Sequence, residues 1–231
     1  MRKINKSPNV PATLQTALVP TCAADVRESI YKADDVRKQL IEDQHYKCAF
    51  CECYITLKYN DVEHYRPKSH YYWLGHDWEN LLYSCPCCNR SYKKVEFPLA
   101  VGSVKANTPS DDIALEYPLI INPADVEPFF HIKFDKYIAK GVSPEGCKII
   151  KIFHLNDNID RPELIDNRKQ LYELYKIEID KIKFAEQMLL NPDLQQTVKD
   201  EANKIIVLSN KSIDNLKSVS KPFSGMLIAQ I

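Results

Sequence analysis

The sequence predicts a mixed α+β protein built around a small metal-bound unit. Three observations predict this class. Two pairs of cysteines stand in the middle of the chain, and strand-like apolar runs follow them. Apolar residues with helical spacing occupy the region before the first pair and the C-terminal third. The 231 residues are enough for one large domain, or for a small domain with an elaboration.

The composition is that of an ordinary globular protein, with 45% hydrophobic and 27% charged residues. The 31 Lys and Arg residues balance 31 Asp and Glu residues, so the formal net charge is zero. This balance excludes binding of nucleic acid by bulk positive charge, and any polyanion site must be a local patch. No secretory signal and no apolar run of roughly 20 residues is present, so we expect a cytoplasmic protein with reduced thiols.

Four consecutive regions are expected. Residues 1–46 form an extended, proline-containing arm followed by a helix over 23–46. Residues 47–95 are dense in Cys, His, Tyr and Trp and hold the chemistry. Residues 96–158 are rich in proline and read as loops with one β-hairpin, whose strands lie in 129–134 and 148–153 around a loop at 141–146.

Residues 159–231 are predicted to form a helical hairpin. Asp160, Pro162 and Glu163 have the order of a helix start, in which Asp160 caps and Glu163 completes a capping box. Apolar residues then recur with helical spacing until Asn191-Pro192, which ends this helix and begins the next.

The cysteines indicate a zinc site. Each of the two C-x-x-C pairs can present two thiolates to one tetrahedral zinc, which closes the coordination shell and makes the site structural. The four predicted ligands are Cys48, Cys51, Cys85 and Cys88. Cys53 and Cys87 stand beside the pairs as alternative ligands, whereas Cys22 and Cys147 have no assigned role. The alternatives are free buried cysteines or a redox pair, but a redox pair would not need a second pair.

The residues around the pairs resemble the HNH endonuclease motif. Glu63-His64-Tyr65-Arg66-Pro67 follows the first pair, Asn80-Leu81 precedes the second, and Asn89 and Lys93 follow it. The resemblance implies a ββα-metal finger held together by zinc, and an enzyme that hydrolyses phosphodiester bonds.

The resemblance also assigns roles to the matching residues. His64 would be the general base, and Asn80 would brace the backbone loop that orients the histidine. Glu63 and Asn89 would bind the catalytic metal. Because Asn89 offers an oxygen in place of an imidazole, we expect Mg²⁺ or Mn²⁺ rather than a softer metal. A neutral histidine can take the proton from water while the metal offsets charge on the leaving oxygen.

Basic residues surround the proposed site, with aromatic residues interleaved. This mixture suits a phosphate backbone and partly exposed bases. The candidate nucleic-acid-binding residues are Arg66, Lys68, Arg90 and Lys93. The alternative is a solvated face over a small core.

From about Tyr46 to the C-terminus the chain resembles, more narrowly, the PtuB-type HNH nucleases of Septu anti-phage systems, which also occur as retron-associated effectors. Segments that carry this resemblance include Tyr72-Trp73-Leu74, Phe97-Pro98-Leu99 and Pro222-Phe223-Ser224. It implies DNA as the expected nucleic acid and an ABC/SMC-like ATPase of the PtuA type as partner. The alternatives are a stand-alone HNH restriction-type endonuclease and a non-catalytic, zinc-stabilised module that binds nucleic acid or protein.

Overall fold

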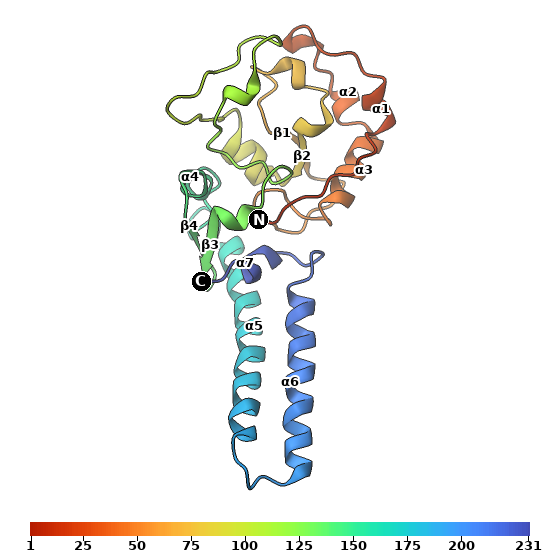
Figure 1. The fold of residues 1–231 in the computed structure, drawn as a ribbon. Coiled ribbons are helices and arrows are strands. Elements are labelled where there is room, and N and C mark those ends of the chain that lie inside the picture. Colours follow the sequence, from red (N-terminus) through yellow and green to blue (C-terminus); the bar gives the residue numbers. More distant parts are fainter.

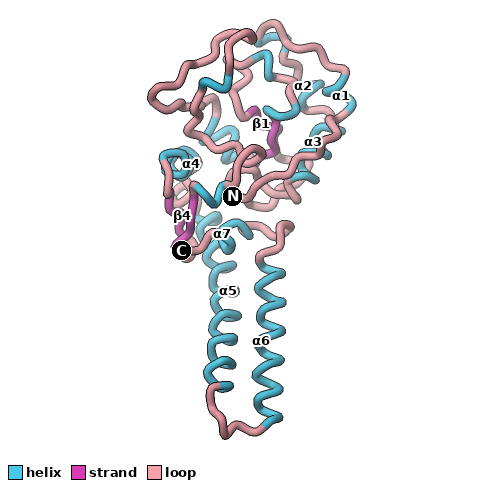
Figure 2. Tube along the Cα trace, viewed as in Figure 1, coloured by secondary structure: helices cyan, strands magenta, loops and turns pink.

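Two long antiparallel helices project from a head that consists mostly of loops (Figures 1 and 2). The computed structural model describes residues 1–231. The projecting helices, α5 (Pro162–Leu189) and α6 (Gln196–Leu216), form a stalk and confirm the predicted C-terminal helical region. Pro162 lies in the first turn of α5 as expected, but Arg161 and not Asp160 occupies the cap position, and no side chain caps it. No helix of the chain combines the length and the apolar character needed to cross a membrane.

A short two-stranded ribbon lies inside the head. Strands β1 (Asp61–His64) and β2 (Leu81–Ser84) are antiparallel, with His64 opposite Leu81, and every residue of both is buried. A seven-residue π-helix, Cys87–Lys93, follows β2. Two strands of four residues are too small to be stable alone, so the ribbon depends on its surroundings. The finger segment, residues 47–95, is therefore held by side chains from the rest of the head.

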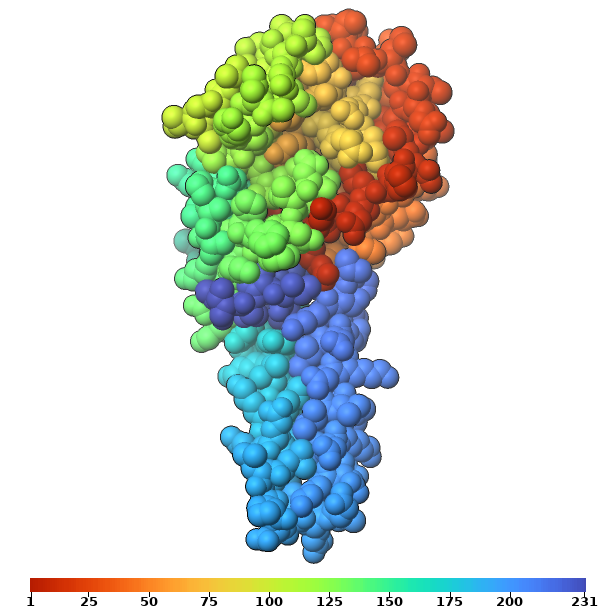
Figure 3. Space-filling view, viewed as in Figure 1, coloured from red at the N-terminus to blue at the C-terminus, as the bar shows by residue number.

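The N-terminal residues run along the head instead of standing free, as the red surface in Figure 3 shows. The backbone N–H of Ile4 donates to the Pro123 carbonyl oxygen at 2.7 Å. The helix predicted over 23–46 is broken into α2 (Glu28–Tyr31) and α3 (Asp34–Asp43), and a single turn, α1 (Ala12–Gln15), precedes them. The predicted apolar side of α3 is buried against β2.

The β-hairpin predicted for 129–154 was placed wrongly. Its strands are β3 (Ile132–Asp135) and β4 (Ile138–Gly141), and residues 144–152 form a helix, α4 (Pro144–Ile152). Ser143 starts α4 because its hydroxyl accepts from the Gly146 backbone N–H at 3.2 Å, and Pro144 fits the first turn. Ile149 and Ile152 then face the core three residues apart, which is a helical and not a strand spacing.

One hydrophobic core of 35 buried residues joins these elements. Phe50 of the finger segment stacks on Phe153 at the end of α4, with ring centroids 4.3 Å apart. The C-terminal residues join it through α7 (Ser224–Ile228), and the Phe134 N–H donates to the Ala229 carbonyl at 2.8 Å. The finger segment is thus enclosed by residues from both ends of the chain.

Candidate active site and metal centre

A cluster of thiols lies beside the ribbon. The sulfur atoms of Cys48, Cys51, Cys53 and Cys85 all lie within 4.8 Å of one another, and no cysteine forms a disulfide. The Cys51 and Cys85 Sγ atoms are 3.8 Å apart. A tetrahedral zinc with Zn–S bonds of about 2.3 Å separates its sulfurs by about 3.8 Å. The cluster therefore has the donor chemistry and spacing of a structural zinc site.

The mutually close sulfurs are not identical with the four predicted ligands. Cys53 joins the cluster, with its sulfur 3.3 Å from that of Cys51, whereas Cys88 is not in this mutually close group. Cys88 is nevertheless fully buried beside it, and its backbone N–H donates to the Cys85 sulfur at 3.5 Å. The Arg161 Nη1 atom is 3.6 Å from the Cys88 sulfur. Five thiols thus surround the centre, while the remaining cysteines, Cys22, Cys87 and Cys147, are exposed.

His64, the last residue of β1, is held in one tautomer. Its Nε2 atom lies 2.9 Å from the Gly75 carbonyl oxygen. Because a carbonyl oxygen only accepts, Nε2 carries the hydrogen and Nδ1 keeps a free lone pair. Burial lowers the pKa of His64 to about 4, so the ring is neutral at pH 7. The side chain can therefore accept a proton at Nδ1.

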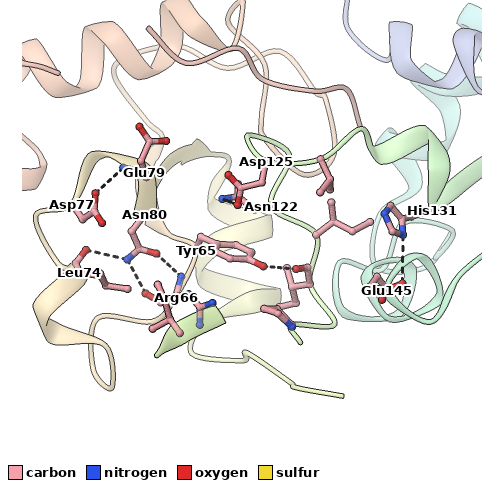
Figure 4. A pocket seen from close by; sticks show the side chains of 15 residues that line it. Tyr65, Arg66, Leu74, Asp77, Glu79, Asn80, Asn122, Asp125, His131 and Glu145 are labelled. Atoms are coloured by element: carbon pink, nitrogen blue, oxygen red, sulfur yellow. Dashed lines mark hydrogen bonds and ion pairs between the residues drawn. The ribbon is translucent and has the colours of Figure 1, made fainter. Parts of the chain in front are cut away.

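Asn80 braces the loop between the strands. Its Oδ1 accepts from the Arg66 backbone N–H at 2.7 Å, and its Nδ2 donates to the carbonyl oxygens of Arg66 and Leu74, both at 3.1 Å. Figure 4 shows the amide lying between these two backbone segments. The braced loop leads directly into Gly75, the acceptor for His64. The side chain thus holds the backbone next to the hydrogen-bond acceptor of His64.

Glu63 is buried with a cation. The Lys93 Nζ atom lies 2.5 Å from Glu63 Oε1 and donates to the His64 carbonyl oxygen at 2.9 Å. Burial raises the pKa of the Glu63 carboxyl, and the charge of Lys93 opposes that rise. The Lys93 side chain is 0% exposed. Lys93, predicted to contact nucleic acid, therefore lies inside the protein and balances the charge of Glu63.

A cavity of about 360 Å³ brings the candidate residues together. Glu63, His64 and Asn89 line it, and so does Asp61, which sequence reasoning missed. Asp61 lies two residues before Glu63 on β1, and alternation along a strand is the signal that could have found it. Carboxylate and amide oxygens are the donors that hard divalent cations prefer, so these residues fit Mg²⁺ or Mn²⁺ by type.

No protein-family model matches the chain. Among curated proteins, the Septu protein PtuB of Bacillus mycoides is 31% identical over 221 residues, covering 85% of this chain and 73% of that protein. The chain belongs to the Septu PtuB family. The PtuB of Bacillus thuringiensis is 28% identical over 200 residues, covering 84% of this chain and 69% of that protein.

In this PtuB-family chain, most of the predicted basic surface is already neutralised. Arg66 forms a buried ion pair with Glu116. Arg90 donates from Nε and Nη2 to the two carboxylate oxygens of Asp61, at 2.8 and 2.6 Å. Lys68 differs, because its Nζ atom donates to the Tyr31 hydroxyl at 2.6 Å and has no carboxylate partner. Of the basic residues predicted to bind nucleic acid, Lys68 alone has no partner of opposite charge.

A second cavity, of about 420 Å³, lies beside Asn80 in this PtuB homologue and is drawn in Figure 4. Its charged lining is mainly acidic and includes Asp77, Glu79, Asp125 and Glu145. Such a lining repels a polyanion. The cavity lined by His64 is less acidic, because Lys32, Lys68, Arg90 and Lys94 also line it.

Proposed function

We propose that this PtuB-family protein is a metal-dependent HNH endonuclease that hydrolyses phosphodiester bonds, with DNA as the expected substrate. The observation that carries the proposal is a neutral His64, with Nδ1 free of a hydrogen, that lines one cavity together with Glu63 and Asn89. The order of β1, β2 and the π-helix beside a thiol cluster supports a ββα-metal finger. A non-catalytic binding module would need neither a buried neutral histidine nor its brace.

In the proposed reaction, His64 Nδ1 accepts a proton from the water that attacks phosphorus. The hydrogen bond from Nε2 to the Gly75 carbonyl fixes the ring and stabilises the imidazolium that forms. Asn80 keeps this carbonyl in place through its bond to Leu74. A divalent cation held by Glu63 and Asn89 would offset the charge that develops on the leaving oxygen.

We further infer that the protein is the effector of an anti-phage defence complex with a PtuA-type ATPase. Membership of the Septu PtuB family supports this inference. The zero net charge also supports it, because a partner would then supply much of the binding to the polyanion. A stand-alone restriction-type endonuclease would instead cut DNA in the absence of any ATPase.

The test is plasmid cleavage with Mg²⁺ or Mn²⁺, by the protein alone and co-purified with the ATPase. We expect His64→Ala to lower the rate by about 10²–10⁴-fold, the range for loss of a general base. His45→Asn is the matched control, because His45 is exposed and its positive φ suits asparagine. Full activity of His64→Ala would contradict the mechanism. DNA binding without cleavage by the wild-type complex would instead favour the binding module.

A further inference from the structure

We propose that Lys68, oriented by Tyr31 of α2, holds the substrate phosphate next to His64. Tyr31 lies outside the finger segment, so the N-terminal region would complete the site. The inference rests on the proposed nuclease function and adds residues that position its substrate.

The charges around the His64 cavity single out Lys68. The cationic side chains that line it are Lys32, Lys68, Arg90 and Lys94. Arg90 is paired with Asp61, and the Lys32 Nζ atom is 2.8 Å from Glu28 Oε1. Lys94 is exposed to solvent, whereas Lys68 is partly buried. Lys68 is therefore the sheltered cation that no carboxylate neutralises, and an anion entering the cavity can pair with it.

Tyr31 connects this cation to the histidine. The Tyr31 hydroxyl donates to Glu28 Oε1 at 3.1 Å, so its oxygen is free to accept from Lys68 at 2.6 Å. The Lys68 Nζ atom also lies 4.5 Å from the centroid of the Tyr31 ring. The same ring meets the His64 ring edge to face, with centroids 4.6 Å apart. The buried Tyr31 side chain thus sets the distance between His64, the proposed base, and Lys68, the proposed phosphate ligand.

The segment that carries Tyr31 is fixed to the loop that carries Gly75. The Arg27 backbone N–H donates to His76 Nε2 at 3.1 Å, and His76 Nδ1 lies 3.1 Å from the Leu18 carbonyl oxygen. A Cβ atom on Gly75 would lie only 2.6 Å from both Val26 methyl carbons, so the two segments approach as closely as glycine allows. Residues 18–31 therefore support His64 from two sides, through Tyr31 and through the Gly75 loop.

The experiment compares Lys68→Met, Lys68→Arg and Tyr31→Phe with two controls. Lys211→Met removes an exposed lysine of α6. Tyr83→Phe removes a hydroxyl that donates to the Leu57 carbonyl oxygen at 3.0 Å and does not line the cavity. For each protein, kcat and KM are measured with Mg²⁺ or Mn²⁺, the equilibrium binding of a 20-base-pair DNA duplex is measured across a salt series, and thermal melting checks folding.

We expect Lys68→Met to raise KM about tenfold. The plot of log K against log salt concentration should become less steep by about 0.9, because one phosphate contact is lost. Lys68→Arg should restore the slope. Tyr31→Phe keeps the charge, so the slope should stay while kcat falls and KM rises several-fold. Neither control should change these quantities.

Equal KM and equal salt slopes for Lys68→Met and Lys211→Met would overturn the inference. An unchanged kcat and KM in Tyr31→Phe would overturn the role of Tyr31. If Lys68→Met fails to fold, Lys68→Gln is measured in its place, because it also removes the charge, and Tyr31→Phe still tests the tyrosine. Should the wild-type protein cleave nothing, both alone and with the ATPase, the proposed function fails, while the salt slopes still decide whether Lys68 contacts phosphate.

Discussion

At the scale of single residues, the buried polar side chains of the site are held by specific partners. Asn80 uses both its acceptor and its two donor hydrogens on backbone atoms of the loop it braces. Lys93 and Glu63 neutralise each other in the same region. Each of these contacts depends on the chemical type of the side chain, because a buried group without its partner destabilises the fold.

We expect Asn80→Ala to lower stability by about 1–3 kcal/mol, because it leaves the Arg66 N–H and two carbonyls without partners. Since the Gly75 carbonyl would then shift, kcat should fall by about 10²-fold. Steady-state cleavage and urea denaturation measure the two effects.

Asn156→Ala is the control for Asn80. Its amide braces Ala139 in the same manner, accepting from the N–H at 2.9 Å and donating to the carbonyl at 2.8 Å. It lines neither of the two cavities described here. A comparable loss of stability with unchanged kcat is expected. An equal fall of kcat in both variants would show that Asn80 acts only on stability.

At the scale of elements, the finger segment depends on its thiol cluster. Its two strands have four residues each, and metal binding would supply part of their folding free energy. Arg161, at the start of α5, lies beside the Cys88 sulfur and links the cluster to the stalk. A metal bound by this cluster would therefore stabilise the ribbon that presents His64.

We expect Cys85→Ser to lose its zinc and to melt at a lower temperature, because Cys85 belongs to the close group of sulfurs. Elemental analysis of zinc per chain and thermal melting measure this. Cys147→Ser is the matched control, because Cys147 is exposed, and this variant should keep about one zinc per chain. Retention of zinc in Cys85→Ser would show that this thiol is not a ligand.

The fourth ligand is tested in the same way. We expect Cys88→Ser to lose zinc as well, because Cys88 is fully buried with a guanidinium at its sulfur. Cys53 is partly exposed and lies 3.3 Å from Cys51, closer than two sulfurs of one zinc tetrahedron. We therefore expect Cys53→Ser to keep its zinc, and the opposite pattern would assign Cys53 as the fourth ligand.

At the scale of the whole molecule, one core connects the site to both ends of the chain. Met1, Phe50, Phe153 and Ala229 all belong to it. The stalk lies mostly outside this core, since few of its apolar residues are buried. The geometry around His64 is therefore a property of the complete head.

We expect Phe153→Ala to lower the free energy of unfolding by about 3–5 kcal/mol, because it removes the ring stacked on Phe50 and leaves a cavity. Phe130→Ala is the control, because Phe130 is 67% exposed, and its effect should stay within about 0.5 kcal/mol. Urea denaturation followed by circular dichroism measures both. Similar losses in the two variants would contradict the importance of the stacked pair.

Local patterns predicted the fold where local interactions dominate. The stalk followed from helical spacing, from the start at Pro162 and from the break at Asn191-Pro192, which act within a few residues. Asn191-Pro192 does not begin the second helix as expected, because α6 starts only at Gln196. The strand expected at 148–153 was wrong because a short apolar run suits either structure, and the cap at Ser143 decided for a helix. The break between α2 and α3 likewise escaped prediction, and it directly follows Tyr31, whose ring packs on His64 from a distant part of the chain.

The sequence by itself determined which chemical groups are neighbours along the chain, such as the cysteine pairs and the adjacent Glu63 and His64. It also determined the two long helices, through their apolar spacing. Only the tertiary structure decided that Cys53 joins the thiol cluster, that Lys93 turns inward to Glu63, and that Tyr31 covers the histidine. Local spacing reflects the geometry of single helices, strands and turns. These three outcomes depend instead on how separate segments pack into one core, where each buried charge must find a partner.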